Sequence, residues 1–478
     1  MRYSYTLAFA CMTLFTITIP TASASETEEF VAKLKTHYQK TLPIKAFSLS
    51  HHYLNKQYRD LEYWDYKTPN RIMANRTVEL DLVKEHFYDN DIYYSSGGLL
   101  RDIAQFQNDK EGFYYDRNGS YIGKRIFNQG TSNFWRMSYI IMDVDFLAIR
   151  PLLEETNIAE NITLHQDRES GTTSLIHKTS DDNVVEYEFR HNLLQLLSLN
   201  NKSKRSKFVY DDYQTTRGIT YARTVYQYFD GATEPNYIIY NDQFEIIDQV
   251  DPANLKLPSG YGPEISKSDG MLVSKNIAKN LYLVTDSSAW RNSLFKVNGD
   301  EIMVFGASGY PSLAERTIKL IHGQFPKKKI TSVYVTHPHG YEIDGLDVYA
   351  DQDIEIIADE YTIAAIKAYP RFADDIAKFK FRIIKDGQII DGAHFYVLEN
   401  LHAKRQSFVH FKDSEIIFQA DFLHIAFDNT IAKVIPNYTR TFIDFVRSEQ
   451  LKFKRIVGSY QNNNISVEVM NKTYDANM

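Results

Sequence analysis

The sequence predicts an α+β protein in two parts, a mostly antiparallel β domain over residues 25–263 and an α/β domain over residues 264–478. Three observations support this prediction. The first part contains recurrent runs of Tyr, Phe, Val and Thr that are typical of strands. The second part alternates strand patterns with helical apolar spacing. Between them, residues 251–263 contain three prolines and two glycines, which is typical of a linker.

The first 24 residues have the pattern of a secretory signal peptide. Arg2 precedes an apolar stretch from Leu7 to Ile19, and the small residues Ala22-Ser23-Ala24 follow. The apolar stretch is shorter than the roughly 20 residues that a membrane span needs. We therefore expect cleavage after Ala24 rather than a membrane anchor, no stable membrane span in the mature chain, and a periplasmic or secreted protein.

Composition narrows the chemistry of the mature chain. Cys11 is the single cysteine, and Ala8-Phe9-Ala10 before it matches poorly the tripeptide that precedes a lipidated bacterial cysteine, so a lipoprotein is the weaker alternative. Cleavage removes the only thiol, which excludes disulfides, Cys-ligated zinc and cysteine nucleophiles. Any metal must then be held by His, Asp, Glu or Tyr. The net charge of −7 argues against a nucleic-acid partner.

Within the N-terminal part, we expect a helix from Glu28 to about Lys40, another over Phe146–Thr156, and strands that include Val184–Phe189 and Tyr237–Asn241. Aromatic residues at strand positions usually form a core or a half-exposed sheet face. The alternative is a curved sheet, similar to the open half-barrel of periplasmic lipoprotein carriers, whose aromatic inner face holds an apolar ligand.

The C-terminal part begins with the order strand, strand, helix, strand. The predicted elements are Asn280–Thr285, Asp300–Phe305, Ser312–Phe325 and Ile330–Val335. The segment Thr336-His337-Pro338-His339-Gly340-Tyr341-Glu342-Ile343-Asp344-Gly345 follows at once. A loop after a strand is the usual place for a site in such a fold, and two histidines one residue apart can face one ion.

This segment resembles the signature of the metallo-β-lactamase superfamily, Thr-His-x-His-x-Asp-His-x-x-Gly. His337, His339 and Gly345 fall on the family positions, whereas Tyr341 and Glu342 replace the aspartate and the third histidine. The resemblance covers about residues 275–465 and implies an αββα sandwich.

Three further positions extend the resemblance. His402 follows a predicted strand, Phe395–Leu398, and falls where the family has its next histidine ligand. Asp421 ends the predicted strand that begins at Glu415 and matches the family's metal-bridging aspartate. Tyr460 stands where the last histidine ligand is expected. The remaining nearby histidines fall at no family position and are expected to be ordinary surface or packing residues; they are His394, His410 and His424.

The resemblance implies a site for one zinc ion held by His337, His339 and His402, with manganese or iron as alternatives. Asp421 is then the candidate catalytic residue, either orienting a water or taking its proton. Asp421 and Glu342 are also candidate metal ligands, since both offer carboxylate oxygens. A second ion is expected only if Glu342 can act as a ligand, because Tyr341, Glu342 and Tyr460 replace the usual ligands of that ion.

Two functions from different classes follow. The first is an exported metal-dependent hydrolase that cleaves an ester, phosphoester, amide or lactone in a small-molecule or lipid-like substrate. The second is a non-catalytic binding or scaffolding protein without metal, whose aromatic N-terminal domain contacts a lipid, peptide or protein. The retained histidines and Asp421 favour the first function, and the three replaced ligands favour the second. The sequence predicts neither the substrate nor the oligomeric state.

Overall fold

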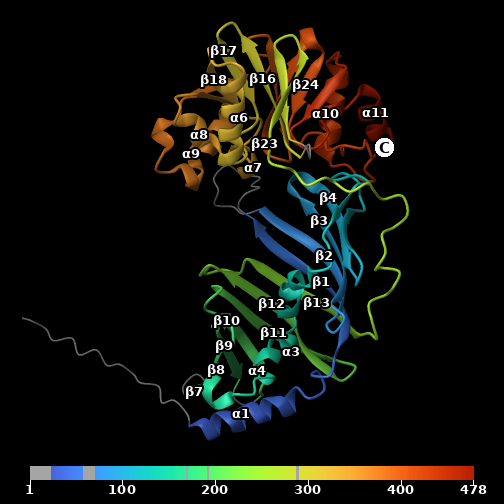
Figure 1. Ribbon diagram of the computed structural model, residues 1–478, viewed down its shortest axis with the longest axis vertical. Coiled ribbons are helices and arrows are strands. Elements are labelled where there is room, and N and C mark those ends of the chain that lie inside the picture. The colour runs from blue at the N-terminus through green and yellow to red at the C-terminus, as the bar shows by residue number, and fades with distance from the viewer. Residues whose placement is uncertain (1–22, 58–69, 168–170, 191–192, 287–289) are drawn as a thin grey trace, which may run out of the picture. The chain divides into compact units, whose positions relative to one another are not determined.

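The computed structural model describes residues 23–57, 70–167, 171–190, 193–286 and 290–478 (Figure 1). Nearly all of the predicted signal peptide lies outside these residues. Contacts divide the chain into two compact units that interleave in sequence. Unit 1 comprises the described residues up to Ile44 together with Tyr139–Asn236, and unit 2 comprises Lys45–Ser138 and Tyr237–Met478. Residue 263, where we placed the domain boundary, falls inside unit 2.

Unit 1 is built on an antiparallel sheet with the strand order β12-β11-β10-β9-β8-β7. The strands are β7 (Ile162–Asp167), β8 (Thr172–Lys178), β9 (Val184–Arg190), β10 (Leu196–Asn201), β11 (Ser206–Thr216) and β12 (Ile219–Phe229). In β9, alternate residues Val185, Tyr187 and Phe189 are buried, because successive side chains of a strand point to opposite faces. Phe30 packs on Phe189 with ring centroids 5.8 Å apart.

Phe30 belongs to the first helix, α1 (Ala24–His37). This helix begins four residues earlier than predicted because Ser23 and Glu26 form a capping box. The remaining helices of this region are α2 (Ser138–Met142), α3 (Asp145–Ala148), α4 (Arg150–Leu153) and α5 (Ile158–Asn161). The single helix predicted over Phe146–Thr156 is wrong. Pro151 lies in the first turn of a new helix, α4, which begins at Arg150, since proline lacks the amide hydrogen that would continue α3.

Unit 2 contains three sheets, counted over the described residues, and the first is antiparallel throughout. Its strand order within the unit is β6-β5-β4-β3-β2-β1-β13. The bounds are β1 (Ala46–Gln57), β2 (Asn70–Asp81), β3 (His86–Ser95), β4 (Leu99–Gln107), β5 (Gly112–Asp116), β6 (Ile126–Asn128) and β13 (Tyr237–Ile246). Short 3-10 turns occupy η1 (Ser96–Gly98), between β3 and β4, and η2 (Phe134–Met137).

The other two sheets of unit 2 stack face to face. The second sheet runs in the order β14 (Val273–Ala278), β15 (Leu281–Thr285), β16 (Asn292–Asn298), β17 (Glu301–Phe305), β18 (Lys329–Tyr334), β19 (Glu355–Asp359) and β20 (Phe381–Ile384), and is parallel from β17 onward. The third runs β21 (Ile389–Ile390), β22 (Ala393–Asn400), β23 (Lys404–Phe411), β24 (Ile416–Gln419) and β25 (Arg455–Gly458). Phe305 and Tyr334 of one sheet and Phe395 and Phe418 of the other share a buried core.

Helices cover the outer faces of these two sheets (Figure 1). On the second sheet lie α6 (Pro311–Gln324), α8 (Leu346–Ala350) and α9 (Glu360–Ala368), and on the third lie α10 (Asn437–Ser448) and α11 (Val467–Asp475). Short elements complete the region, namely α7 (Gly340–Ile343), η3 (Pro370–Phe372), η4 (Ile376–Lys378) and η5 (Lys412–Ser414). The mixed α/β class with large antiparallel sheets is thus confirmed, and the open half-barrel stays a prediction.

Candidate metal centre

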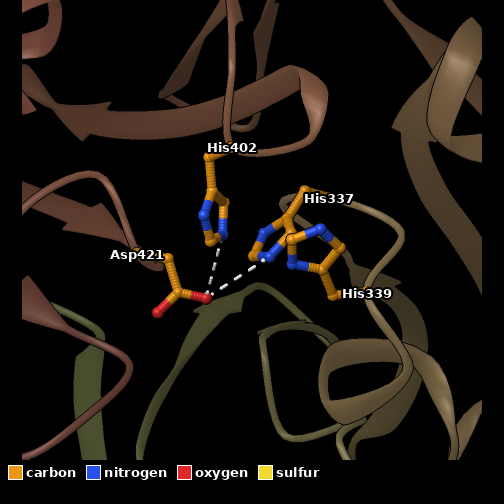
Figure 2. A group of neighbouring side chains, drawn as sticks. All are labelled: His337, His339, His402 and Asp421. Atoms are coloured by element: carbon orange, nitrogen blue, oxygen red, sulfur yellow. Dashed lines mark ion pairs between the residues drawn. The ribbon is translucent and has the colours of Figure 1, made fainter. Parts of the chain in front are cut away.

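Four side chains that are far apart in the sequence converge in unit 2. His337 and His339 follow β18, His402 lies in the turn between β22 and β23, and Asp421 lies two residues beyond β24. One nitrogen or oxygen atom from each lies within 4.8 Å of those of the other three, and all four residues are buried. Figure 2 shows the three imidazoles turned toward the Asp421 carboxylate. The structure therefore brings together the three predicted histidines and Asp421.

Hydrogen bonds on the outer side of two imidazoles fix their orientation. Nδ1 of His337 lies 2.9 Å from Thr336 Oγ1, and Nδ1 of His339 lies 2.7 Å from the Tyr341 hydroxyl. When Nδ1 carries the proton and donates it to these oxygens, Nε2 keeps its lone pair. A second hydrogen bond of this kind is the usual support of a metal-binding histidine.

Asp421 is held in an uncommon backbone conformation. Its φ of 60° lies in the left-handed region, which aspartate tolerates better than most residues. Its Oδ2 lies 3.3 Å from Nε2 of His337 and 3.5 Å from Nε2 of His402. Burial raises the pKa of Asp421, but the close imidazoles of His337 and His402 outweigh burial and hold this pKa well below its usual range. The carboxylate is therefore ionised.

The buried atoms of this cluster fit a cation. Nε2 of His337 and Oδ2 of Asp421 are buried, and neither has a hydrogen-bond partner in the described part of the chain. Buried polar atoms are seldom left in this state, and a positive ion between them would satisfy both. Imidazole nitrogens with one carboxylate oxygen form a donor set that suits zinc, and the same types of ligand also accept manganese or iron.

Glu342 lies outside this cluster. Its carboxylate accepts a hydrogen bond of 2.8 Å from Arg291 Nη1, and both side chains are largely buried, with 4% and 14% exposed. Arg291 also donates to the Tyr341 carbonyl over 2.7 Å and lies over the Tyr460 ring, 3.9 Å from its centroid. The three residues that replace the family's ligands for a second metal thus all contact one guanidinium group.

His424 was missed by sequence reasoning. Its Nε2 lies 3.7 Å from Asp421 Oδ1, on the other oxygen of the carboxylate, and is buried. Burial lowers the pKa of His424 to about 3 against the attraction of Asp421, so its imidazole is neutral. Because β24 ends at Gln419, a histidine three residues beyond Asp421 gave no strand or helix periodicity from which this contact could be predicted. By contrast, His410 donates a hydrogen bond from Nε2 to the Lys452 carbonyl, as expected of a packing residue.

A cavity of about 280 Å³ opens beside the cluster. Its walls include His402, Asp421 and Tyr460 from the stacked sheets, and Arg101 and Tyr121 from the antiparallel first sheet and the loop that follows β5. All of these residues belong to unit 2. The site is thus built from both parts of the sequence that we had assigned to separate domains.

The turn between β3 and β4 lies close to the cluster formed by His337, His339, His402 and Asp421. Gly97 in this turn has a φ of 73°, and a Cβ atom placed on it would lie 2.8 Å from both His402 Cα and Tyr438 Cδ1. Such a contact is too short for any side chain, so a glycine is required. The turn therefore packs its backbone directly on the loop that presents His402.

Substituting Gly97 tests this contact. We expect Gly97→Ala to lower the free energy of unfolding by about 1–3 kcal/mol more than Gly98→Ala, since only the first substitution overpacks the site. Gly98 is a matched control because its φ of 85° imposes the same backbone strain while nothing lies within 4 Å. Urea unfolding measures both variants. Equal losses of stability would show that the turn does not press on His402.

Comparisons with known proteins concern the fold. No protein-family model matches the chain, and no curated protein matches its sequence. Among solved structures, a metallo-β-lactamase from Hirschia baltica is similar with 13% identity and a TM-score of 0.34, covering 43% of this chain and 97% of its own. The metallo-β-lactamase FIM-1 from Pseudomonas aeruginosa, in its mono-zinc form, is similar with 14% identity and the same TM-score, covering 43% and 94%. Nothing about activity follows from these likenesses.

Proposed function

We propose that this protein is a metal-dependent hydrolase that works with a single metal ion, held by His337, His339 and His402 with Asp421 beside it. The observation that carries the proposal is the convergence of these four buried side chains within 4.8 Å. Three imidazoles and one carboxylate have no structural need to be buried together. A divalent cation gives them that need, since it offsets the charge and satisfies the buried lone pairs.

The proposal of a single ion, rather than two, rests on the position of Arg291. A second ion would require ligands around Tyr341, Glu342 and Tyr460, and these residues surround a guanidinium instead. Burial lowers the pKa of Arg291, but Tyr460 and Glu342 raise this pKa by more than burial lowers it. The guanidinium therefore stays charged. A fixed positive charge repels a second cation in a medium that screens poorly. Glu342 is accordingly proposed as the partner of Arg291 rather than as a metal ligand.

A zinc ion with three protein ligands lowers the pKa of a coordinated water to about 7 and polarises a carbonyl or phosphoryl oxygen. The residues of the chain supply the rest. Asp421, which is ionised, accepts a proton or orients the attacking water. His424 lies beside the other carboxylate oxygen, and Tyr341 and Thr336 orient the imidazoles of His339 and His337 through hydrogen bonds. The substrate class is an ester, phosphoester, amide or lactone.

The setting proposed for this activity is outside the cytoplasm. The pattern of residues 1–24 supports export to the periplasm or beyond. The described chain contains no helix that is both long and apolar enough to span a bilayer. A small-molecule or lipid-like substrate fits a cavity of about 280 Å³ better than a macromolecule does.

Metal content tests the proposal directly. The protein is purified without chelator, supplied in turn with zinc, manganese and iron, and measured by elemental mass spectrometry. We expect about one equivalent of one metal, followed by hydrolysis of at least one of the four substrate classes. No bound metal under any supply would overturn the proposal and leave the non-catalytic binding function.

Asp421→Asn separates catalysis from metal binding. The amide keeps the shape of the side chain but cannot accept a proton, so we expect the metal content to stay near one equivalent while hydrolysis falls at least about 100-fold. Asp413→Asn, at an exposed residue of η5, serves as the control. Unchanged hydrolysis in Asp421→Asn would remove Asp421 from the reaction.

A further inference from the structure

Arg101 is a half-buried cation whose role the cluster of His337, His339, His402 and Asp421 does not explain. It belongs to β4 and lines the same cavity as His402 and Asp421. Its Nη1 atom is buried without a hydrogen-bond partner, and among the residues that the structure describes no carboxylate lies within ion-pair distance of it. The guanidinium lies over the face of the Tyr121 ring, 4.3 Å from the centroid. Nη1 of Arg101 is thus a buried donor without a partner at the wall of the cavity.

Arg291, the other arginine that lines this cavity, already has hydrogen-bond partners. Glu342 and the Tyr341 carbonyl already occupy its donors. Arg101 is therefore the cation that a ligand can reach.

Burying Nη1 of Arg101 without a hydrogen-bond partner is unfavourable, and another interaction must offset that free energy. Removing a charged group from water costs several kcal/mol unless an opposite charge and hydrogen bonds replace the water. The planar guanidinium matches a carboxylate or phosphate in two parallel hydrogen bonds. A ligand that carries such an oxyanion is the natural partner of this group.

The rest of the cavity indicates what accompanies the oxyanion. Leu99, Trp290, Leu423 and Ile425 are among its lining residues, so part of the wall is apolar or aromatic. A small molecule with a compact apolar body and one oxyanion group fits this combination.

We propose that Arg101 binds the oxyanion, a carboxylate or a phosphate, of the small molecule on which the metal cluster acts. This inference rests on the proposed hydrolase function for the identity of the ligand as a substrate, but the anion site itself needs no metal. The first sheet, through β4, would then set the substrate specificity of chemistry performed on the stacked sheets.

The test measures binding to protein freed of metal by chelation, so that no ion can hold the anion. The probes are benzoate, phenyl phosphate and uncharged benzamide, titrated by calorimetry, with ligand-observed NMR as a second readout. We expect benzoate or phenyl phosphate to bind and benzamide not to bind. The tighter anion identifies the oxyanion as carboxylate or phosphate.

Arg101→Gln is expected to weaken anion binding at least about tenfold, because it removes charge-assisted hydrogen bonds. Arg117→Gln is the matched control, since Arg117 lies just beyond β5, its side chain is directed to Asn90 and Asp102, and it does not line the cavity. If circular dichroism shows that Arg101→Gln does not fold, Arg101→Lys replaces it. Lysine keeps the charge but cannot form the two parallel hydrogen bonds, so this variant should also weaken binding of the preferred anion.

Absence of saturable binding of either anion, or equal binding in wild type and the Arg101 variant, would overturn this inference. Its failure is distinguishable from failure of the proposed function, because metal content is measured separately on untreated protein. A protein that binds one metal but no anion keeps the hydrolase proposal and loses only the role of Arg101.

Discussion

His339→Ala should abolish metal binding, reducing the content from about one equivalent to less than a tenth of that value. Three protein ligands define a zinc site with an open position, and two histidines with one carboxylate of fixed orientation hold the ion much more weakly. Stability should change in parallel. At a zinc concentration 100-fold above its dissociation constant, binding adds about 2.7 kcal/mol to the free energy of unfolding, and the variant should show none of this gain.

Elemental mass spectrometry and thermal unfolding with and without zinc measure these two effects on the same samples. His394→Ala is the matched control, because His394 lies on β22 in the same sheet as the His402 turn and outside the cluster. A variant that still binds one equivalent, or that zinc still stabilises, would contradict the assignment of His339.

Arg291→Met is expected to cause the largest loss of stability, about 3–5 kcal/mol, because it leaves a buried carboxylate without its charge partner. The Glu342 side chain is only 4% exposed, so water cannot replace the guanidinium. Adding Glu342→Gln to Arg291→Met removes the stranded charge and should restore most of the loss. Urea unfolding measures the single and the double variant.

Arg371→Met provides the comparison for this effect. Arg371 forms an ion pair of 2.6 Å with Asp347, but the two side chains are 37% and 31% exposed. An exposed pair contributes less than about 1 kcal/mol. Similar losses in the two arginine variants would show that the Arg291–Glu342 pair is solvated in solution, and would reopen Glu342 as a metal ligand.

The sequence predicted the metal cluster better than it predicted the surroundings of the cluster. His337 and His339 are neighbours, and His402 and Asp421 each follow an apolar run that is readable as a strand. Those local patterns locate the four residues of the cluster. Arg291, His424 and Arg101 have no comparable signal, because an arginine or histidine in a loop or on a strand is usually a surface residue. Their contacts depend on tertiary packing between distant segments.

Dependence on tertiary packing also limits how much of the fold the sequence predicts. Apolar runs such as Val184–Phe189 and Ile330–Val335 correspond to β9 and β18, because their side-chain pattern is a local property. The pairing of β1 with β13, which aligns Phe47 with Ile246, follows no local rule. A proline- and glycine-rich stretch marks a change of texture at residues 251–263, but contacts group the chain without regard to it.

The interleaving of the two units has a practical consequence for expressing fragments of this protein. A fragment that starts after residue 263 keeps His337, His339, His402 and Asp421 and loses β4 with Arg101 and the turn at Gly97. It would expose the backbone around His402 that this turn covers. Truncation at the linker therefore yields the four-residue cluster without the Arg101 side of its cavity, and measurements on such a fragment would not represent the whole chain.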